Sequence, residues 1–492
     1  MRTASELEAA YTAKPVWIGD NKDGGSGVLT LAGRQTSVLL TTPEHLRERG
    51  GTTGWFDLAL HDGRDEKIFL HNALTRQTRF PNRNGADWEF ELFPNIVVLN
   101  AGAIAASGRV LEIQFTADGL EDFFHYELTE RQPLYQASSS TLRSIRDLRK
   151  IPQHYPRTYD HFSPTDVYVL HDLPRVLRER VGDRTYEIYI GHRESIGLHS
   201  LTLSAVATAK IRFDSPVLLD EALDAIWSWR RYFQQIAMRP LPFLTLSCRA
   251  GVKRRDRWSE LYLPNLEGAA PPSDRERTSF GPGEVTYGQW RHRRKFAAAM
   301  RRWLELDQQR RLFRVRVDRV LEAKRKEASL RLVAELCSAI ESLDELKAPT
   351  TISDADLSVV IEAAASAGAA ASPPIARDRL QGVLSLLQHQ SLPKRLKLLA
   401  AGIEAHLPKD DAKTLIKIAR DLRTFDAHGG RWDEMTMPLI APTIDMLASM
   451  CVLWDLTTSD LPAAFDERTL VASRSLTTNA MEIKFHRSSK GG

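Results

Sequence analysis

Arg423 and His428 are the residues of this sequence whose types and spacing best suit a chemical reaction. They are separated by four residues in the segment 418–430, IARDLRTFDAHGG. Histidine moves protons near neutral pH because its ordinary pKa is about 6.5. Arginine holds phosphate with a planar fork of donors. The pair therefore suits metal-free RNA cleavage, with His428 as general base or acid and Arg423 stabilising the phosphorane charge.

The spacing alone is not specific, because an arginine followed by four to six residues and a histidine recurs in the chain. The other pairs lie in a strand-rich region, whereas Arg423 and His428 end an amphipathic helix that a further helix follows. Context therefore selects this pair. The other pairs are Arg64 and His71, Arg149 and His154, and Arg193 and His199.

Helix geometry constrains how Arg423 and His428 can act together. On an ideal helix, residues five apart are rotated by about 140°. We therefore expect the helix to end or distort between them, and Gly429 and Gly430 can provide a helix stop. Asp426 falls within the apolar stripe of the same helix, which also predicts irregular backbone there.

The elements that must position this pair are helices, predicted from Tyr287 onward by apolar residues at helical spacing. Leu415, Ile418 and Leu422 mark the helix that carries Arg423. Short connections between such helices predict an antiparallel bundle. The polar residues 466–492 are expected to form a loose tail.

The first 267 residues are predicted to form mainly strands. Leu111, Ile113 and Phe115 alternate with polar residues, which is typical of a sheet with one buried face. The overall fold class is therefore α+β. Further candidate strands are Trp55–His61, Lys67–Leu70, Asn95–Leu99, Thr185–Gly191 and Leu201–Phe213.

One helix interrupts the strand pattern. Ser215 is expected to cap it, Pro216 fits its first position, and the apolar spacing ends at Ala237. Trp227 and Trp229 within it are expected to pack in the core, with ligand stacking as the alternative. The predicted organisation is a strand-rich domain at 1–267, a linker at 268–286, a basic connecting helix at 287–322, a helical domain at 323–465 and the tail at 466–492.

Segments of the chain resemble a known family. Residues 392–428 (LPKRLKLLAAGIEAHLPKDDAKTLIKIARDLRTFDAH) resemble the core of the ApeA-like HEPN ribonuclease domain, and residues 93–99, 119–124 and 214–237 resemble its ApeA N-terminal domain. The resemblance implies that Arg423 and His428 are catalytic, and that Glu341 matches an acidic position of the first helix. Thr424 stands where the family usually has asparagine, and it is either a substitute polar residue beside Arg423 or a sign that the site has decayed.

The same resemblance implies a biological role. Such proteins look like effectors of abortive infection, the bacterial anti-phage defence, with an RNA substrate. In that family, two such motifs from two chains face each other across a dimer, which implies a homodimer or higher homo-oligomer here. The two-domain layout, apart from the resemblance, suggests the hypothesis that the N-terminal domain restrains or triggers the nuclease by sensing a phage-derived component.

Charge is unevenly distributed along the chain. Residues 291–331 contain fifteen lysines or arginines and five acidic residues, a net charge of +10, so the remainder carries −6 of the total of +4. This stretch predicts RNA contact through phosphates, and its alternatives are a solvated helix face or docking onto the acidic remainder. The candidate RNA-binding residues are Arg291, Arg293, Arg294, Lys295 and Arg420.

Other function classes receive little support. Cys248, Cys337 and Cys451 are far apart and form no CxxC pair, which favours a reducing cytoplasm. No cofactor or metal is expected, because no ligand spacing is present. No signal peptide or membrane span is expected. Two alternatives to a nuclease remain: a catalytically inactive scaffold that binds RNA or protein, and a carbohydrate-binding module with the bundle as a dimerisation device.

Overall fold

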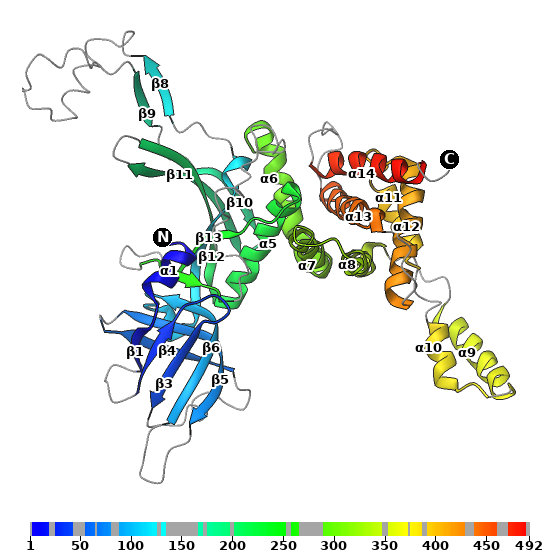
Figure 1. Cartoon of the computed structure of the whole chain (residues 1–492), viewed down its shortest axis with the longest axis horizontal. Coiled ribbons are helices and arrows are strands. Elements are labelled where there is room, and N and C mark those ends of the chain that lie inside the picture. Colours follow the sequence, from blue (N-terminus) through cyan, green and yellow to red (C-terminus); the bar gives the residue numbers. More distant parts are fainter. Residues whose placement is uncertain are drawn as a thin grey trace, which may run out of the picture.

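The computed structural model has an α+β fold, which confirms the predicted class: strands dominate the N-terminal half and helices the C-terminal half (Figure 1). The predicted linker 268–286 lies outside the residues that the structure describes. The described residues are 2–18, 25–42, 55–63, 66–79, 88–124, 129–133, 166–170, 175–196, 201–251, 257–264, 289–346, 353–371, 374–385, 391–428, 437–459 and 471–488.

The first six strands form a closed antiparallel barrel. Their order is β6-β3-β2-β1-β4-β5, and pairing of β5 with β6 closes it. Apolar side chains fill the interior, where Leu40, Leu60 and Phe90 are buried. The strands are β1 (Lys14–Ile18), β2 (Ser26–Thr30), β3 (Ser37–Thr42), β4 (Trp55–Asp62), β5 (Lys67–Arg79) and β6 (Trp88–Leu99), preceded by helix α1 (Ala4–Ala10).

The barrel continues into an open antiparallel sheet. Strand β14 pairs with β6, and the order then runs β13, β7, β12, β11 and β10. These strands are β7 (Arg109–Ala117), β10 (Arg175–Val181), β11 (Arg184–Ile196), β12 (Leu201–Leu218), β13 (Phe243–Arg249) and β14 (Ser259–Tyr262); the short elements are α3 (Ile104–Ser107), η2 (Glu121–Phe123) and the hairpin of β8 (Thr129–Pro133) with β9 (Asp166–Leu170).

Helix α5 (Leu219–Ala237) packs on β7 and β12, but it begins later than predicted. Ser215 and Pro216 do not start it: both lie in β12, whose pairing with β7 resumes at Val217 after a register shift. Ladder pairing therefore outcompetes the local capping signal, and a proline is tolerated at such an irregularity because no ladder N–H is needed there.

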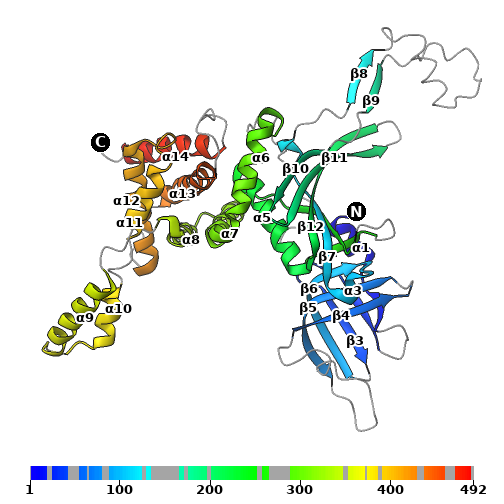
Figure 2. The ribbon, with the colours of Figure 1, turned by 180° about the vertical axis from the view of Figure 1, so that it is seen from behind.

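The helical half is built around α13, which contacts α7, α8, α11, α12 and α14. Helices α9 and α10 project from the rest as a hairpin in both views (Figures 1 and 2). The helices are α6 (Gln289–Glu305), α7 (Asp307–Ala323), α8 (Leu330–Glu341), α9 (Asp354–Ala369), α10 (Arg377–Ser385), α11 (Leu392–Ala401), α12 (Lys409–His428), α13 (Met437–Thr457) and α14 (Val471–Ser488), with the 3-10 turn η5 (Asp344–Leu346).

Two predicted boundaries were wrong. The expected single connecting helix at 287–322 is two helices, α6 and α7, that meet at Leu306. The expected loose tail contains α14, which buries Leu476 and Ile483 next to α13. The apolar face of α14 consists partly of alanine, so its composition is polar although one side is buried.

The two halves share one continuous hydrophobic core. It runs from Phe115 in β7 through Trp229 in α5, Met300 in α6 and Val317 in α7 to Leu447 in α13. Helices α6 and α7 thus join the sheet to the bundle by packing. Separating the halves would expose this apolar surface, so intact chains carrying point substitutions are the better experimental material.

Helix α13 also explains the one apolar segment of note among the described helices. Residues Pro438–Thr457 are long and apolar enough to span a membrane by length and composition alone. Within the molecule, 83% of that window is buried against other helices. Packing at the centre of the bundle accounts for its apolar character.

Candidate functional site

Arg423 and Glu341, 82 residues apart in the sequence, form a bidentate ion pair. The Arg423 Nη1 donates to Glu341 Oε1 at 2.7 Å and its Nη2 donates to Oε2 at 2.8 Å. The two side chains are 34% and 33% exposed. The structure thus brings together two of the four predicted catalytic residues at a surface that solvent reaches.

The pair leaves part of the Arg423 guanidinium available. A guanidinium has five N–H donors, and Glu341 accepts from two of them. In the described part of the chain, no acceptor contacts the other three. These include the fork formed by Nε and Nη2, which matches two oxygens of a phosphate. Arg423 can therefore hold an anion while Glu341 fixes its orientation.

Packing of α8 against α12 creates this arrangement. Leu422 precedes Arg423 and is buried in the bundle, so Arg423 emerges at the rim of the interface. One turn before Glu341, Cys337 is buried, and burial raises the pKa of its thiol to about 12. Cys337 is thus an apolar packing residue, and the polar chemistry is confined to Glu341 and Arg423.

Arg395 in α11 positions Glu341 and was missed at the sequence level. It is buried, and its Nη1 donates to the main-chain oxygen of Glu341 at 2.5 Å. It therefore satisfies a carbonyl at the C-terminal end of α8. Arg395 lies in the apolar stripe of Leu392, Leu396 and Leu399, and an arginine within such a stripe is the signal that could have found it.

Thr424 and Arg420 lie on the exposed side of α12. The Thr424 hydroxyl donates to the main-chain oxygen of Arg420 at 2.9 Å, so its proton is used within the helix. Arg420 pairs with its neighbour Asp421 at 2.7 Å. Among the described contacts, none joins Thr424 to Glu341 or to the Arg423 guanidinium, whereas Arg420 shares a surface with Arg423 because residues three apart on a helix are neighbours.

The expected break between Arg423 and His428 is wrong. Helix α12 continues without interruption to His428, and Asp426 is exposed although the helical wheel placed it in the apolar stripe. Burial on α12 therefore departs from the ideal wheel at Asp426. The side chain of His428 lies outside the described residues, as do Gly429 and Gly430.

The candidate RNA-binding residues of α6 are separate from Arg423. Arg294 and Lys295 are exposed, and the side chains of Arg291 and Arg293 lie outside the described residues. In both views α13 lies between α6 and α12 (Figures 1 and 2). Helix α6, which carries Arg294 and Lys295, therefore lies apart from α12, which carries Arg420 and Arg423.

Much of the basic stretch 291–331 is engaged within the molecule. The ion pairs match the alternative interpretation, docking onto the acidic remainder of the chain. They join Arg301 to Glu179, Arg311 to Asp224, Arg316 to Glu335, Lys324 to Asp445, and Arg310 to both Glu345 and Asp455.

Asp455 in α13 is the centre of a buried charge cluster that the sequence analysis missed. Its oxygens accept from Arg310 Nη1 at 2.9 Å, from Arg314 Nε at 2.8 Å and from Trp303 Nε1 at 3.1 Å. The guanidinium of Arg314 also stacks 3.6 Å from the Trp303 ring. The cluster fastens α6 and α7 to α13; an aspartate in an otherwise apolar helix was its sequence signal.

Neither metal-ligating side chains nor similarity to known proteins point to another reaction. The described residues contain no group of three or more histidine, cysteine, aspartate or glutamate side chains that could hold a metal. Compared with known proteins, the chain matches no protein-family model, no curated protein and no solved structure. The Arg423–Glu341 pair is the site on which a function can be argued.

Proposed function

We propose that the chain is a metal-independent endoribonuclease of bacterial anti-phage defence, acting by abortive infection in the cytoplasm. The resemblance to ApeA-like HEPN proteins suggests the biological role. The observation that carries the chemistry is the Arg423 guanidinium, which Glu341 holds while three of its N–H groups have no acceptor among the described residues and can bind a phosphate. The N-terminal half would receive a phage-derived trigger.

In the proposed reaction, the 2′-oxygen of a ribose attacks the adjacent phosphorus and the bond to the 5′-oxygen breaks. His428 takes the proton of the 2′-hydroxyl or gives one to the leaving 5′-oxygen. Arg423 stabilises the additional negative charge of the phosphorane. The products are a 2′,3′-cyclic phosphate and a 5′-hydroxyl, and the step needs no metal.

The test compares wild type with Arg423→Ala and His428→Ala on total bacterial RNA in EDTA. We expect each substitution to lower the cleavage rate by roughly a hundredfold or more, with the circular dichroism spectrum retained. Arg379→Ala is the matched control: Arg379 is an exposed arginine of α10, remote from the site, and its loss should not change the rate. Wild-type protein that cuts nothing, or variants that cut equally well, would overturn the proposal.

A homodimer completes the proposal, because one arginine and one histidine can supply one proton transfer at a time. Two motifs facing each other would provide both transfers within a shared cleft. Light scattering alongside the cleavage assay tests this. A monodisperse monomer with full ribonuclease activity would contradict it.

A second candidate function is a non-catalytic scaffold that holds RNA or a partner protein. The ion pair itself favours it, because a surface arginine bound to a glutamate from a neighbouring helix is also a common structural link. Thr424 adds support, since its hydroxyl is engaged with the helix backbone. The scaffold predicts RNA retention without cleavage, and that Arg423→Ala alters binding alone.

A further inference from the structure

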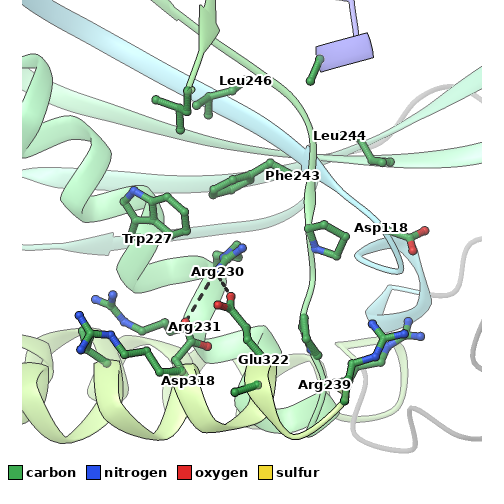
Figure 3. A pocket seen from close by; sticks show the side chains of 18 of the residues that line it. Asp118, Trp227, Arg230, Arg231, Arg239, Phe243, Leu244, Leu246, Asp318 and Glu322 are labelled. Atoms are coloured by element: carbon green, nitrogen blue, oxygen red, sulfur yellow. Dashed lines mark hydrogen bonds and ion pairs between the residues drawn. The ribbon is translucent and has the colours of Figure 1, made fainter. Parts of the chain in front are cut away.

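A large cavity lies between the sheet and the helical half. Its volume is about 1410 Å³, above the roughly 300–1,000 Å³ of most small-molecule sites. Helix α1 and the barrel rim, the segment from α5 to β13, and the segment from α7 to α8 form its walls. Figure 3 shows Trp227, Arg230 and Phe243 facing Asp318 and Glu322 of α7.

The cavity is strongly basic. Nine lysines and arginines line it against five carboxylates. Two of those carboxylates, Asp318 and Glu322, are already occupied by Arg230, at 3.6 and 3.0 Å. Arg2, Arg231 and Arg239 pair with Glu260, Asp307 and Asp122, which do not line the cavity. The cations are Arg2, Arg34, Arg230, Arg231, Arg239, Arg319, Arg325, Lys326 and Arg331.

Three of these arginines differ from the rest of the basic stretch. Arg319, Arg325 and Arg331 are exposed and, among the described residues, have no ion-pair or hydrogen-bond partner. Arg325 and Arg331 flank the turn between α7 and α8. Arg331 lies in the first turn of α8, where Ser329 makes no side-chain capping bond. The backbone N–H groups at this helix start add to the attraction for an anion.

The opposite wall is aromatic. Trp227 and Phe243 lie edge to face with ring centres 5.0 Å apart, and the guanidinium of Arg230 stacks 4.5 Å from Trp227. Trp227 was expected to be a core residue with ligand stacking as the alternative. Trp229 is the fully buried one, whereas Trp227 is half-buried and lines the cavity. Cations on one wall and aromatic rings on the other match a ligand with phosphates and a planar base.

Helix α8 connects this cavity to the candidate catalytic arginine. Arg331, Leu332 and Glu335 of its N-terminal part line the cavity, and Glu341 at its end holds Arg423, about 15 Å farther along the axis. Arg316 of α7 ties the helix in place, since it donates to the main-chain oxygen of Ser338 at 2.7 Å. Because α8 is short and moves as one unit, a displacement of its first turn also moves its last turn, where Glu341 lies.

We propose that this cavity binds a nucleotide carrying two or more phosphates, and that α8 transmits its binding to Glu341 and Arg423. The phosphates lie against Arg319, Arg325 and Arg331, and the base against Trp227. The binding site stands independently of the ribonuclease activity. Regulation of cleavage through α8 rests on the proposed function.

Binding is tested by calorimetry on the full chain with ATP, GTP and inorganic tripolyphosphate. We expect saturable binding that weakens with salt, and at least tenfold weaker binding of all three probes to the double variant Arg325→Ala/Arg331→Ala. The control Arg379→Ala should bind like wild type. Trp227→Leu should weaken the nucleotides and spare tripolyphosphate. No saturable binding below millimolar concentration, or unchanged binding by the double variant, would overturn the site.

Transmission is tested by hydrogen exchange, which does not depend on RNA cleavage. With ATP bound, we expect slower exchange at the start of α8 and a change at residues 337–346, around Glu341. Exchange that changes near Arg331 alone would overturn transmission and leave the site standing. Binding with a hydrogen-exchange response, in a protein that never cleaves RNA, would refute the proposed function and not the site.

Discussion

Two arginine–carboxylate sites of the bundle have the same chemistry and opposite surroundings. At Asp455, the carboxylate and the Arg314 side chain are both fully buried, and Arg310 is 5% exposed. At Glu341 and Arg423, about a third of each side chain is exposed. All three nitrogens of Arg314 donate to acceptors in the core, whereas three N–H groups of Arg423 have no acceptor among the described residues.

This difference in exposure determines which site stabilises the fold and which site can bind a ligand. A buried charge without its partner is costly, so the Asp455 cluster is expected to hold α6, α7 and α13 together. A half-exposed pair adds only about 0–1 kcal/mol to stability. The fold therefore depends little on Arg423, which leaves this residue available for an anion.

The largest expected effect is at Asp455. Asp455→Ala removes the buried carboxylate that Arg310 and Arg314 share and leaves them the more exposed Glu345 and Asp307, so it should lower the free energy of unfolding by about 3–5 kcal/mol. Urea unfolding followed by circular dichroism measures it. The exposed Asp410, paired with Lys413, provides the control, since Asp410→Ala should change stability by at most about 0.5 kcal/mol. Equal losses of stability in Asp455→Ala and Asp410→Ala would show that the buried cluster stabilises the fold no more than an exposed ion pair does.

Lowering the pH provides a second test of the Asp455 cluster. Burial alone would raise the pKa of Asp455, but Arg314 and Arg310 outweigh it and hold that pKa below its ordinary value. The stabilisation is therefore complete above about pH 4 and is lost as pH falls through the folded-state pKa. The difference between wild type and Asp455→Asn should shrink only below about pH 4.

Arg423 should give the reverse pattern. Arg423→Ala should lower the RNA cleavage rate by about 10²–10³, because the phosphorane loses its main positive charge. The free energy of unfolding should change by no more than about 1 kcal/mol, since the ion pair is half-exposed. Parallel rate and urea measurements test both. Destabilisation as large as that at Asp455 would make Arg423 a structural residue and favour the scaffold.

The sequence predicted the parts of the fold that depend on local periodicity. Alternation along 110–116 and 185–191 identified β7 and β11, and helical spacing identified α5, α12 and α13. Closure of the barrel was not predictable, because it depends on pairing of β5 with β6 and on strand order, which periodicity does not encode. The single core that joins both halves was missed because the basic α6 and α7 suggested a solvated connector.

The site was predictable in its residues and not in its contacts. The Arg-x4-His spacing and the resemblance selected Arg423 and Glu341, which the structure places in contact. Arg395, which contacts Glu341, and Asp455 of the separate buried cluster depend on long-range packing, so a charged residue within an apolar stripe was their only sequence signal. The helical wheel placed Asp426 in the apolar stripe, but that residue is exposed.

A smaller effect is expected for Glu341→Gln. Glutamine keeps the size and one acceptor oxygen, so Arg423 loses one charge-assisted bond and part of its orientation. We expect a roughly tenfold lower kcat, corresponding to one such bond, with KM little changed. Steady-state cleavage of a short RNA measures both. A higher kcat would show instead that Glu341 competes with the phosphate and restrains the enzyme.

The smallest effect is expected at His71 in the N-terminal half. Its side chain forms ion pairs with two carboxylates and is intermediate in exposure between the Asp455 cluster and the Arg423–Glu341 pair. Its imidazole, 12% exposed, lies 2.9 Å from Asp57 of β4 and 3.0 Å from Asp220 of α5. Burial alone would lower the pKa of His71, but the two carboxylates outweigh it and raise that pKa above about 6.5. The stabilisation is then full below pH 6.5 and is lost as pH rises through the folded-state pKa.

His71→Gln should therefore cost about 1 kcal/mol at pH 6 and less at pH 9, because both carboxylates are substantially exposed. Thermal unfolding at the two pH values measures the difference. The double variant Asp57→Asn/Asp220→Asn should abolish the pH dependence of the His71 effect. If the cost at pH 9 equals that at pH 6, His71 acts by packing alone, and its charge does not fasten α5 to the barrel.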